Sequence, residues 1–187
     1  MAFSAFPNLP GDIGSVIRTR QGGGGEAMFV AGQGIKVKGL AEFLRKCDRM
    51  SPEFSRELRK AAYAIAKDLS VKVLIEAGTV SRSRQAVAVA KGLRAKNDRY
   101  PTISLRGQSP FPSKSRPPRK RNRPVTRADV FFGAEFGGGA SSRTDQFLRH
   151  RGRSGYFFWR TVRKNKNSIA KEYLEAIDRI VKTLGID

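Results

Sequence analysis

Residues 51–78 carry the pattern that most constrains the fold, an apolar stripe long enough for a helix of about 25 residues, or about 37 Å. Ser51 is a good N-cap, Pro52 fits the first helical position, and Glu53 suits the positive end of the helix dipole. Gly78 is a suitable end. The apolar residues recur at helical spacing: Phe54, Leu58, Ala61, Ala62, Ile65, Leu69 and Val73. Such a helix is long for a small domain.

A second long helix is predicted near the C-terminus, with Ser154 as its cap and Gly185 as its stop. Its apolar positions are Phe158, Val162, Ile169, Tyr173, Ile177, Ile180, Val181 and Leu184. The aromatic residues at 156–159 are consecutive, so they cannot all face one core from a helix. We therefore expect one or two of them to meet a partner.

Shorter elements lie between and before these helices. Alternation predicts strands at Ile35–Val37 and Ile103–Leu105, and a short helix is predicted around 40–47. Residues 81–98 favour a basic helix, although the sequence AVAV within them also suits a strand. A half-buried strand is predicted at 130–136, with Glu135 on its outer face, and 146–155 form a short strand or turn. The order of elements predicts an α+β fold, a small antiparallel sheet packed by two long helices.

Two segments differ in composition from the rest. Residues 1–33 hold a GGGG tract and two prolines, and we expect a flexible, extended N-terminal arm there. Residues 108–126 form a long basic, proline-rich loop insert that cannot build a core. The remainder, 34–187, is predicted to be one domain, and the length of 187 residues suits that number.

Charge is distributed unevenly along the chain. The formal net charge is +21, of which residues 82–166, with 22 basic and 4 acidic side chains, carry +18. Residues 1–81 carry +4 and residues 167–187 carry −1. Such an excess of positive charge indicates an anionic partner, either nucleic acid or the acidic faces of neighbouring proteins. No helix-turn-helix, zinc finger or RNA-binding sheet motif is evident, so sequence-specific readout is not expected.

No constellation of residues indicates catalysis, a cofactor or a metal. Acidic residues are scattered, and Asp129 and Glu135 on one strand face would lie about 20 Å apart. The single Cys47 excludes an internal disulfide, and the single His150 argues against a histidine-built site. No apolar run is long enough for a membrane span, and no signal-peptide pattern begins the chain, so we expect a cytoplasmic protein.

Glu135 is the only carboxylate between Asp129 and Asp145. It can be an exposed acid at a strand end, one half of a salt bridge between subunits, or a catalytic group, and the last is the weakest interpretation. The basic run Lys114–Arg127 likewise allows three interpretations, a solvated loop, a contact with DNA phosphates, or a docking segment for acidic protein neighbours.

The segments follow one another in the order IKVKGL, a long helix, GLR, an Arg-rich insert, GAEFGG, QF, GYFFW with VR, and a C-terminal helix. This order resembles that of the neck or tail-completion (head-to-tail joining) proteins of long-tailed bacteriophages, the lambda gpZ-like group. The resemblance covers about residues 34–184. In that family a strand typically ends in an acid–aromatic–glycine turn, here Glu135-Phe136-Gly137. The chain departs from the family pattern in two ways. Its N-terminal arm and its insert are longer than in the family, and Gly92–Arg94 fall in a predicted helix where the family often has a turn into a strand.

The resemblance implies a structural virion protein, not an enzyme, assembled in the host cytoplasm into a ring, commonly of six subunits, at the head–tail junction. Its partners would be further copies of the chain, adjacent connector or stopper proteins, tail-terminator or tail-tube proteins, and genomic DNA in the lumen. Alternatives are a tail-terminator ring or a non-specific nucleic-acid-binding protein. Candidate subunit or DNA contacts are Lys114, Arg116, Arg119, Lys120, Arg121, Arg123, Glu135, Phe136, Arg149, Arg151, Tyr156 and Trp159.

Overall fold

A computed structural model describes residues 27–30, 40–81, 84–105, 125–138 and 146–185. The elements, in chain order, are β1 (Ala27–Val30), α1 (Leu40–Met50), α2 (Pro52–Thr79), α3 (Arg84–Ala90), β2 (Leu93–Lys96), β3 (Thr102–Leu105), α4 (Arg127–Phe136), the short 3-10 helix η1 (Gly152–Ser154) and α5 (Phe158–Leu184). The expected α+β fold, with a small antiparallel sheet and two long helices, is confirmed.

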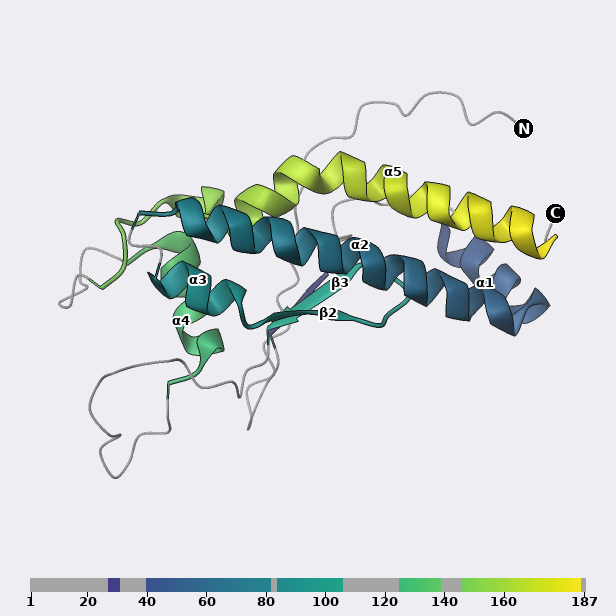
Figure 1. Cartoon of the computed structure of the whole chain (residues 1–187), viewed down its shortest axis with the longest axis horizontal. Helices are drawn as coiled ribbons and strands as arrows, with labels where there is room; N and C mark the ends of the chain where they lie inside the picture. The colour runs from purple at the N-terminus through teal and green to yellow at the C-terminus, as the bar shows by residue number, and fades with distance from the viewer. Residues whose placement is uncertain (1–26, 31–39, 82–83, 106–124, 139–145, 186–187) are drawn as a thin grey trace.

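The two long helices α2 and α5 run antiparallel, side by side, along the length of the molecule (Figure 1). The sheet has the order β1-β3-β2, and both pairings are antiparallel. Ile103 at the centre of β3 lies opposite Phe29 on one side and Ala95 on the other. Helix α2 packs on β2 and β3, so the sheet lies against one side of the helical layer.

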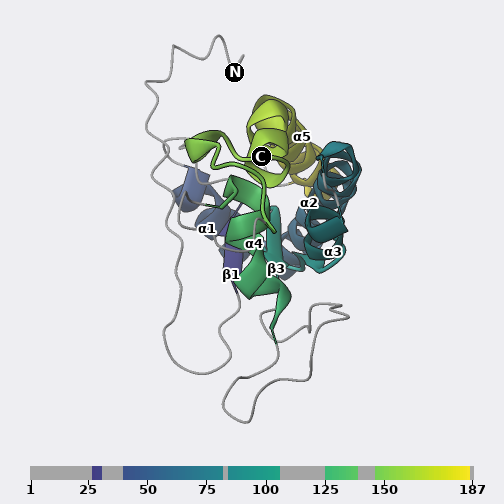
Figure 2. The ribbon, with the colours of Figure 1, turned by 90° about the vertical axis from the view of Figure 1, so that its left-hand side faces the viewer.

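The buried side chains form two clusters. The larger one joins the middle and end of α2 to α3, the sheet, α4 and the start of α5. The smaller one lies at the other end, where α1, the start of α2 and the end of α5 meet around Phe54, Leu58 and Tyr173. Figures 1 and 2 place α4 and the start of α5 at the end of the molecule opposite α1. The two clusters thus stabilise opposite ends of one elongated layer of helices.

The helices α1, α2 and α5 form where the apolar stripes predict them, and Gly185 ends α5 in the left-handed conformation with φ +61°. Ser51 occupies the N-cap of α2, but its side chain makes no capping hydrogen bond. Ser154 does not cap α5, because the helix begins only at Phe158 and its N-cap residue is Phe157. The prediction of Ser154 as a cap was therefore wrong.

Residues 130–136, predicted as a strand, belong to helix α4. The reason is local: Thr126 accepts a hydrogen bond from the Asp129 N–H, and the Asp129 carboxylate accepts one from the Thr126 N–H at 2.9 Å. This capping box starts a helix. The buried residues of α4 are Val130, Phe131, Ala134 and Glu135, a helical spacing that the apparent alternation had hidden.

Two other predictions change. The basic helix ends at Ala90, and Leu93–Lys96, predicted as its continuation, form strand β2 after a turn at Gly92. Residues Ala27–Val30, assigned to the arm, form strand β1 because β3 offers them a free edge to pair with. The predicted strand at 35–37, the rest of the arm and most of the 108–126 insert lie outside the described residues.

Candidate functional site

Glu135, the acid that the sequence singles out, is buried with 0% of its surface exposed. Its carboxylate accepts three backbone hydrogen bonds, from the N–H groups of Phe157 at 3.2 Å, Phe158 at 2.8 Å and Trp159 at 2.8 Å. The first N–H groups of a helix have no partner within the helix. Glu135 therefore supplies the cap that α5 lacks at its own N-cap residue, and it does so from a different helix.

Backbone hydrogen bonds fix the same two segments to each other. The Tyr156 N–H donates to the Glu135 carbonyl at 2.7 Å, and the Arg151 N–H donates to the Phe136 carbonyl at 2.9 Å. The Gly138 N–H donates to the Leu148 carbonyl at 2.7 Å. We call this set of contacts between residues 135–138 and 148–159 the Glu135 junction. It fixes the end of α4 against the start of α5.

Two glycines are required by the geometry of this junction. Gly155 has φ +68°, and a Cβ atom there would lie 2.0 Å from the Glu135 Oε1 atom. Gly137 has φ +86°, and a Cβ atom there would lie 2.4 Å from the Arg149 carbonyl oxygen. Both contacts are far closer than van der Waals distance, and both φ values favour glycine. The glycines allow the two segments of the junction to approach closely enough for the carboxylate to reach the α5 N–H groups.

Opposing influences act on the Glu135 carboxyl group. Burial raises the pKa of Glu135 above its ordinary value of 4.5, because the charged form loses its hydration. The three backbone N–H groups and the positive charge of Arg163 lower it in part. The carboxylate is thus a structural group stabilised by helix N–H donors, and no second titratable side chain among the described residues shares a hydrogen bond with it.

The loop that leads into α5 carries exposed arginines at alternate positions, Arg149, Arg151 and Arg153, which we call the arginine loop. Its conformation is fixed from several directions. The Tyr156 hydroxyl donates to the Arg149 carbonyl at 2.6 Å, and the Arg151 guanidinium lies 5.2 Å from the centre of the Tyr156 ring. Arg163 of α5 donates to the Arg153 carbonyl at 3.0 Å and also to the Ser154 carbonyl.

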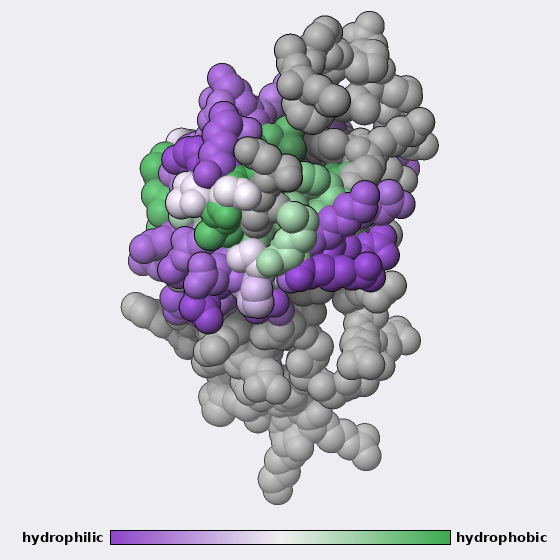
Figure 3. Space-filling model, turned by 90° about the vertical axis from the view of Figure 1, so that its right-hand side faces the viewer, coloured by the Kyte–Doolittle hydropathy of each residue, from purple (hydrophilic) through white to green (hydrophobic). Residues whose placement is uncertain are grey.

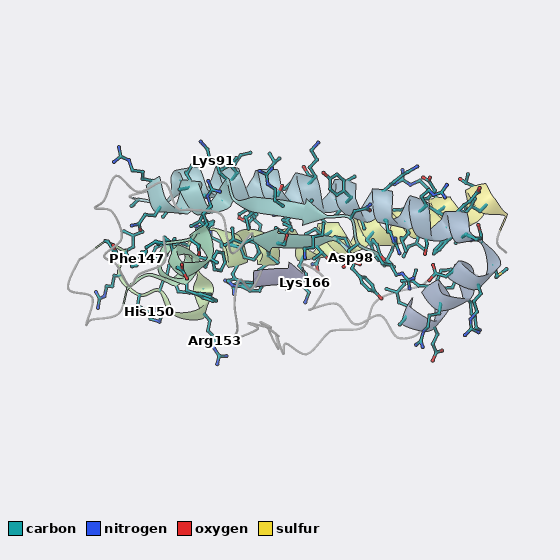
Figure 4. All side chains as sticks on the ribbon, turned by 90° about the horizontal axis from the view of Figure 1, so that it is seen from below. Lys91, Asp98, Phe147, His150, Arg153 and Lys166 are labelled. Carbon is teal, nitrogen blue, oxygen red and sulfur yellow. The ribbon has the colours of Figure 1, made fainter. Side chains whose placement is uncertain are left out.

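Figure 4 shows Phe147, His150 and Arg153 at this end of the molecule, with the Arg153 side chain extending away from the ribbon. The Phe147 ring lies against Gly133 of α4, where a Cβ atom would be 2.4 Å from its Cζ atom. Behind the loop, the Phe131 and Phe158 rings pack edge to face with their centres 5.6 Å apart. The arginine loop is therefore supported by a rigid aromatic cluster rather than by a loosely packed surface.

Several cations elsewhere on the described surface pair with a neighbouring acid. Lys72 lies 2.7 Å from Asp68, Lys182 lies 2.8 Å from Asp178, and Lys171 lies 3.9 Å from Glu175, all one helical turn apart. Arg160 reaches Glu76 of α2, and Arg99 pairs with Asp48. Within the described ranges, the three arginines of the arginine loop form no ion pair, and Glu135, the acid at the end of α4, is buried.

The structure changes the interpretation of several predicted contacts. Glu135 cannot be a subunit contact, an exposed strand-end acid or one half of a salt bridge between subunits, because its side chain is fully buried. Phe136, Tyr156 and Trp159 are half-buried, whereas Arg149 and Arg151 are exposed. Of the four consecutive aromatic residues, Phe157 and Phe158 are buried. Lys114, Arg116, Arg119, Lys120, Arg121 and Arg123 lie outside the described residues.

Sequence reasoning missed Gly155, Arg153 and Arg163. Gly155 precedes the aromatic run, and its position just before a helix start was an available signal for a special backbone conformation. Arg153 continues the alternation of Arg149 and Arg151 and could have been included with them. Arg163 could not be placed, because its partners are backbone carbonyl groups ten and nine residues earlier in the chain.

No group of three or more His, Cys, Asp or Glu side chains that could hold a metal is found in the part of the chain that the structure describes. None of the described helices is both long and apolar enough to cross a membrane. Comparisons with protein-family models, with curated proteins and with solved structures find no match. The site therefore has to be interpreted from its own geometry.

Proposed function

We propose that this chain is a structural, non-catalytic virion protein of a tailed bacteriophage that forms a ring at the head–tail junction and joins tail to head around the DNA channel. The proposal rests on the resemblance to neck and tail-completion proteins and on the surface of the subunit. The start of β2 at Leu93 agrees with the turn into a strand that the family pattern has at Gly92–Arg94, which supports the proposal, whereas Glu135-Phe136-Gly137 end helix α4 and not the strand of the family pattern.

The observation that carries the proposal is the presence of two separate apolar surfaces on one subunit. A closed ring is built from heterologous contacts, in which one patch of each subunit meets a different patch of the next. Such a subunit must expose two non-identical binding surfaces when it is alone. Large exposed apolar side chains on a lone chain indicate interaction sites when they gather in patches.

The first surface, the apolar end, lies where α1, α2 and α5 meet. Met50 is 63% exposed and Phe43 is 40% exposed. Beside them a groove of about 340 Å³ between α2 and α5 is lined by Ala61, Ile180 and Leu184, among others. Figure 3, which faces this end of the molecule, shows hydrophobic surface bordered by hydrophilic side chains. The arrangement resembles the apolar centre and polar rim of a protein interface.

The second surface, the α2 stripe, consists of Val71 and Ile75. Ile75 is 65% exposed and Val71 is 49% exposed, and the two are one helical turn apart. Along α2, at 1.5 Å per residue, they lie about 15 and 21 Å beyond Ala61 of the groove. The two surfaces are therefore separate, as a head-to-tail contact requires.

The test is the oligomeric state, measured by light scattering during size-exclusion chromatography after nuclease treatment in moderate and high salt. We expect the wild type to form a discrete ring, and Val71→Asp/Ile75→Asp to abolish it. The matched control, Arg56→Ala/Arg59→Ala, changes the net charge by the same amount at exposed positions of the same helix and should leave the ring intact. A wild type that stays monomeric both alone and with purified tails would refute the proposal.

A mixing experiment tests the head-to-tail geometry directly. The α2-stripe variant keeps the apolar end, and Phe43→Asp/Met50→Asp keeps the α2 stripe. If the contact is heterologous, each variant alone is monomeric, and an equimolar mixture forms a dimer that cannot grow. Rings in the mixture, or dimers of either variant alone, would contradict this arrangement.

A tail-terminator ring of the same junction has the same subunit geometry and is distinguished by which purified partner, tail or head, the protein joins. The second candidate function, non-specific nucleic-acid binding, is favoured by the exposed arginine loop and by the net charge of +21. Six copies in a ring would carry about +126, so the two functions are compatible in one assembly.

A further inference from the structure

The arginine loop combines three features, its positive charge, its fixed backbone and its lack of large exposed apolar side chains. Arg149, Arg151 and Arg153 are exposed within five residues, without an acidic partner among the residues that the structure describes. An arginine guanidinium matches the geometry of a phosphate group, to which it can donate two parallel hydrogen bonds.

The loop is held in place before any ligand arrives. Arg163 binds the Arg153 and Ser154 carbonyls, Tyr156 binds the Arg149 carbonyl, and the Arg151 N–H binds the Phe136 carbonyl. Below it, Glu135 fixes the start of α5. Ordering a flexible loop weakens binding, so a loop that is already ordered binds an anion at lower entropic cost. This rigidity distinguishes the arginine loop from a solvated charged segment.

The surroundings favour nucleic acid over an acidic protein as the partner. The centre of a protein–protein interface is apolar and depleted in charge. None of the large exposed apolar side chains of the described residues lies within 146–185, and Phe132, 39% exposed, is the single one on α4, which contacts the loop. A cationic surface with exposed arginines and without such an apolar centre suits the phosphate backbone, which is bound without reading base sequence.

We propose that the arginine loop, Arg149, Arg151 and Arg153, is a non-specific binding surface for the phosphate backbone of duplex DNA, held in position by Arg163 and Tyr156. The inference deepens the proposed function, in which DNA passes through the ring, and it rests on that function only for the source of the DNA. In the ring, the arginine loop would then face the channel.

The test is the salt dependence of binding to a fluorescently labelled 30-base-pair duplex of mixed sequence, with the full-length, nuclease-treated protein. Each phosphate contact contributes about 0.9 to the slope of log K against log salt concentration. We expect Arg149→Gln/Arg151→Gln/Arg153→Gln to flatten the slope by about 2 to 3. For each lost contact, the loss of affinity relative to the wild type should be about eightfold greater at 0.1 M salt than at 1 M salt.

The matched control is Lys72→Gln/Lys171→Gln/Lys182→Gln, which removes the same charge from lysines that are already ion-paired. This control should retain the wild-type slope, and Arg149→Lys/Arg151→Lys/Arg153→Lys should retain most of it because the charges remain. Circular dichroism verifies that each variant is folded. If the glutamine variant and the control have equal slopes, or if the wild type does not bind the duplex, the inference is wrong.

A polyglutamate peptide separates DNA from an acidic protein partner. If the wild type binds the peptide as tightly as the duplex, with the same loss in the glutamine variant, the arginine loop is a protein-docking surface and the inference is overturned. The Val71→Asp/Ile75→Asp variant separates the two proposals, because it should fail to form rings, whereas Arg149→Gln/Arg151→Gln/Arg153→Gln in that background should still flatten its salt slope by about 2 to 3. Ring formation and DNA binding can therefore fail independently.

Discussion

Substitution of Gly155 by alanine tests the geometry of the Glu135 junction most directly. Gly155 and Gly152 have nearly the same φ, +68° and +62°. A Cβ atom at Gly152 would have nothing within 4 Å, whereas one at Gly155 would lie 2.0 Å from Oε1 and 2.9 Å from Cδ of Glu135. Gly152→Ala is therefore a control for a positive φ without a clash, whereas Gly155 also has ψ 169°, a combination that almost only glycine adopts.

The expected magnitudes follow from these distances. A positive φ destabilises an alanine by about 1–2 kcal/mol at Gly152, and the φ +68°, ψ 169° backbone of Gly155 destabilises one by about 1–3 kcal/mol. At Gly155 the carboxylate must also move, and its Oε1 atom then loses the Trp159 N–H at 2.8 Å. Loss of a hydrogen bond to a charged group costs about 1.5–3 kcal/mol. We expect the free energy of unfolding to fall by about 3–5 kcal/mol for Gly155→Ala and by about 1–2 kcal/mol for Gly152→Ala.

Urea denaturation followed by circular dichroism at pH 7, at one protein concentration, measures both values. In a Glu135→Ala background the clash is removed, so the added effect of Gly155→Ala should shrink to that of its backbone strain, about 1–3 kcal/mol, a coupling that the double-mutant cycle isolates. Equal destabilisation by the two glycine substitutions, or full additivity with Glu135→Ala, would refute the close approach of Gly155 to the carboxylate.

Three further predictions concern the same end of the molecule. Glu135→Ala leaves the Phe157, Phe158 and Trp159 N–H groups without their acceptor, so urea denaturation should show a loss of about 3 kcal/mol, against less than about 0.5 kcal/mol for the exposed Glu42→Ala. The pKa of Glu135 is raised in the folded state, so the folded protein binds the proton of this carboxyl group more tightly than the unfolded chain does. This contribution to stability is present below pH 4.5 and is lost as pH rises through the folded pKa. Glu135→Gln should lack this part of the pH dependence in denaturation curves, and identical pH profiles of the wild type and the variant would contradict the prediction. Thr126→Ala removes the capping box of α4 and should destabilise by about 0.5–2 kcal/mol, whereas Thr126→Ser should be nearly neutral in the same assay.

The parts of the fold that the sequence predicts are those whose signal is contained in one segment. The stripes of α2 and α5 repeat over seven or eight turns, so a helical period is unambiguous. Residues 130–136 are too short for that, and Val130, Phe132, Ala134 and Phe136 imitate the alternation of a strand. The local signal that decides the matter is Thr126 followed three residues later by Asp129, the capping box.

The role of Glu135 could not be predicted from the sequence, for a physical reason. Its partners are backbone N–H groups 22 to 24 residues later, and every non-proline residue has such a group. No side-chain pattern therefore marks them. The exposed arginines of the arginine loop are visible as composition, but their lack of acidic partners depends on which neighbours fold beside them. Strand β1 likewise becomes recognisable only through its pairing with β3.

The Glu135 junction closes a hydrogen-bonded frame around residues 139–147, because Gly138 is bound to Leu148 and Glu135 to the α5 start on either side of that segment. Covalent continuity through residues 139–145 is then not what keeps α4 attached to α5. A single proteolytic nick there should leave two fragments that stay associated and refold together after mixing, and new termini placed at this point should be tolerated in a circularly permuted chain. The same frame would let insertions of different length be carried there without altering how the two helices meet.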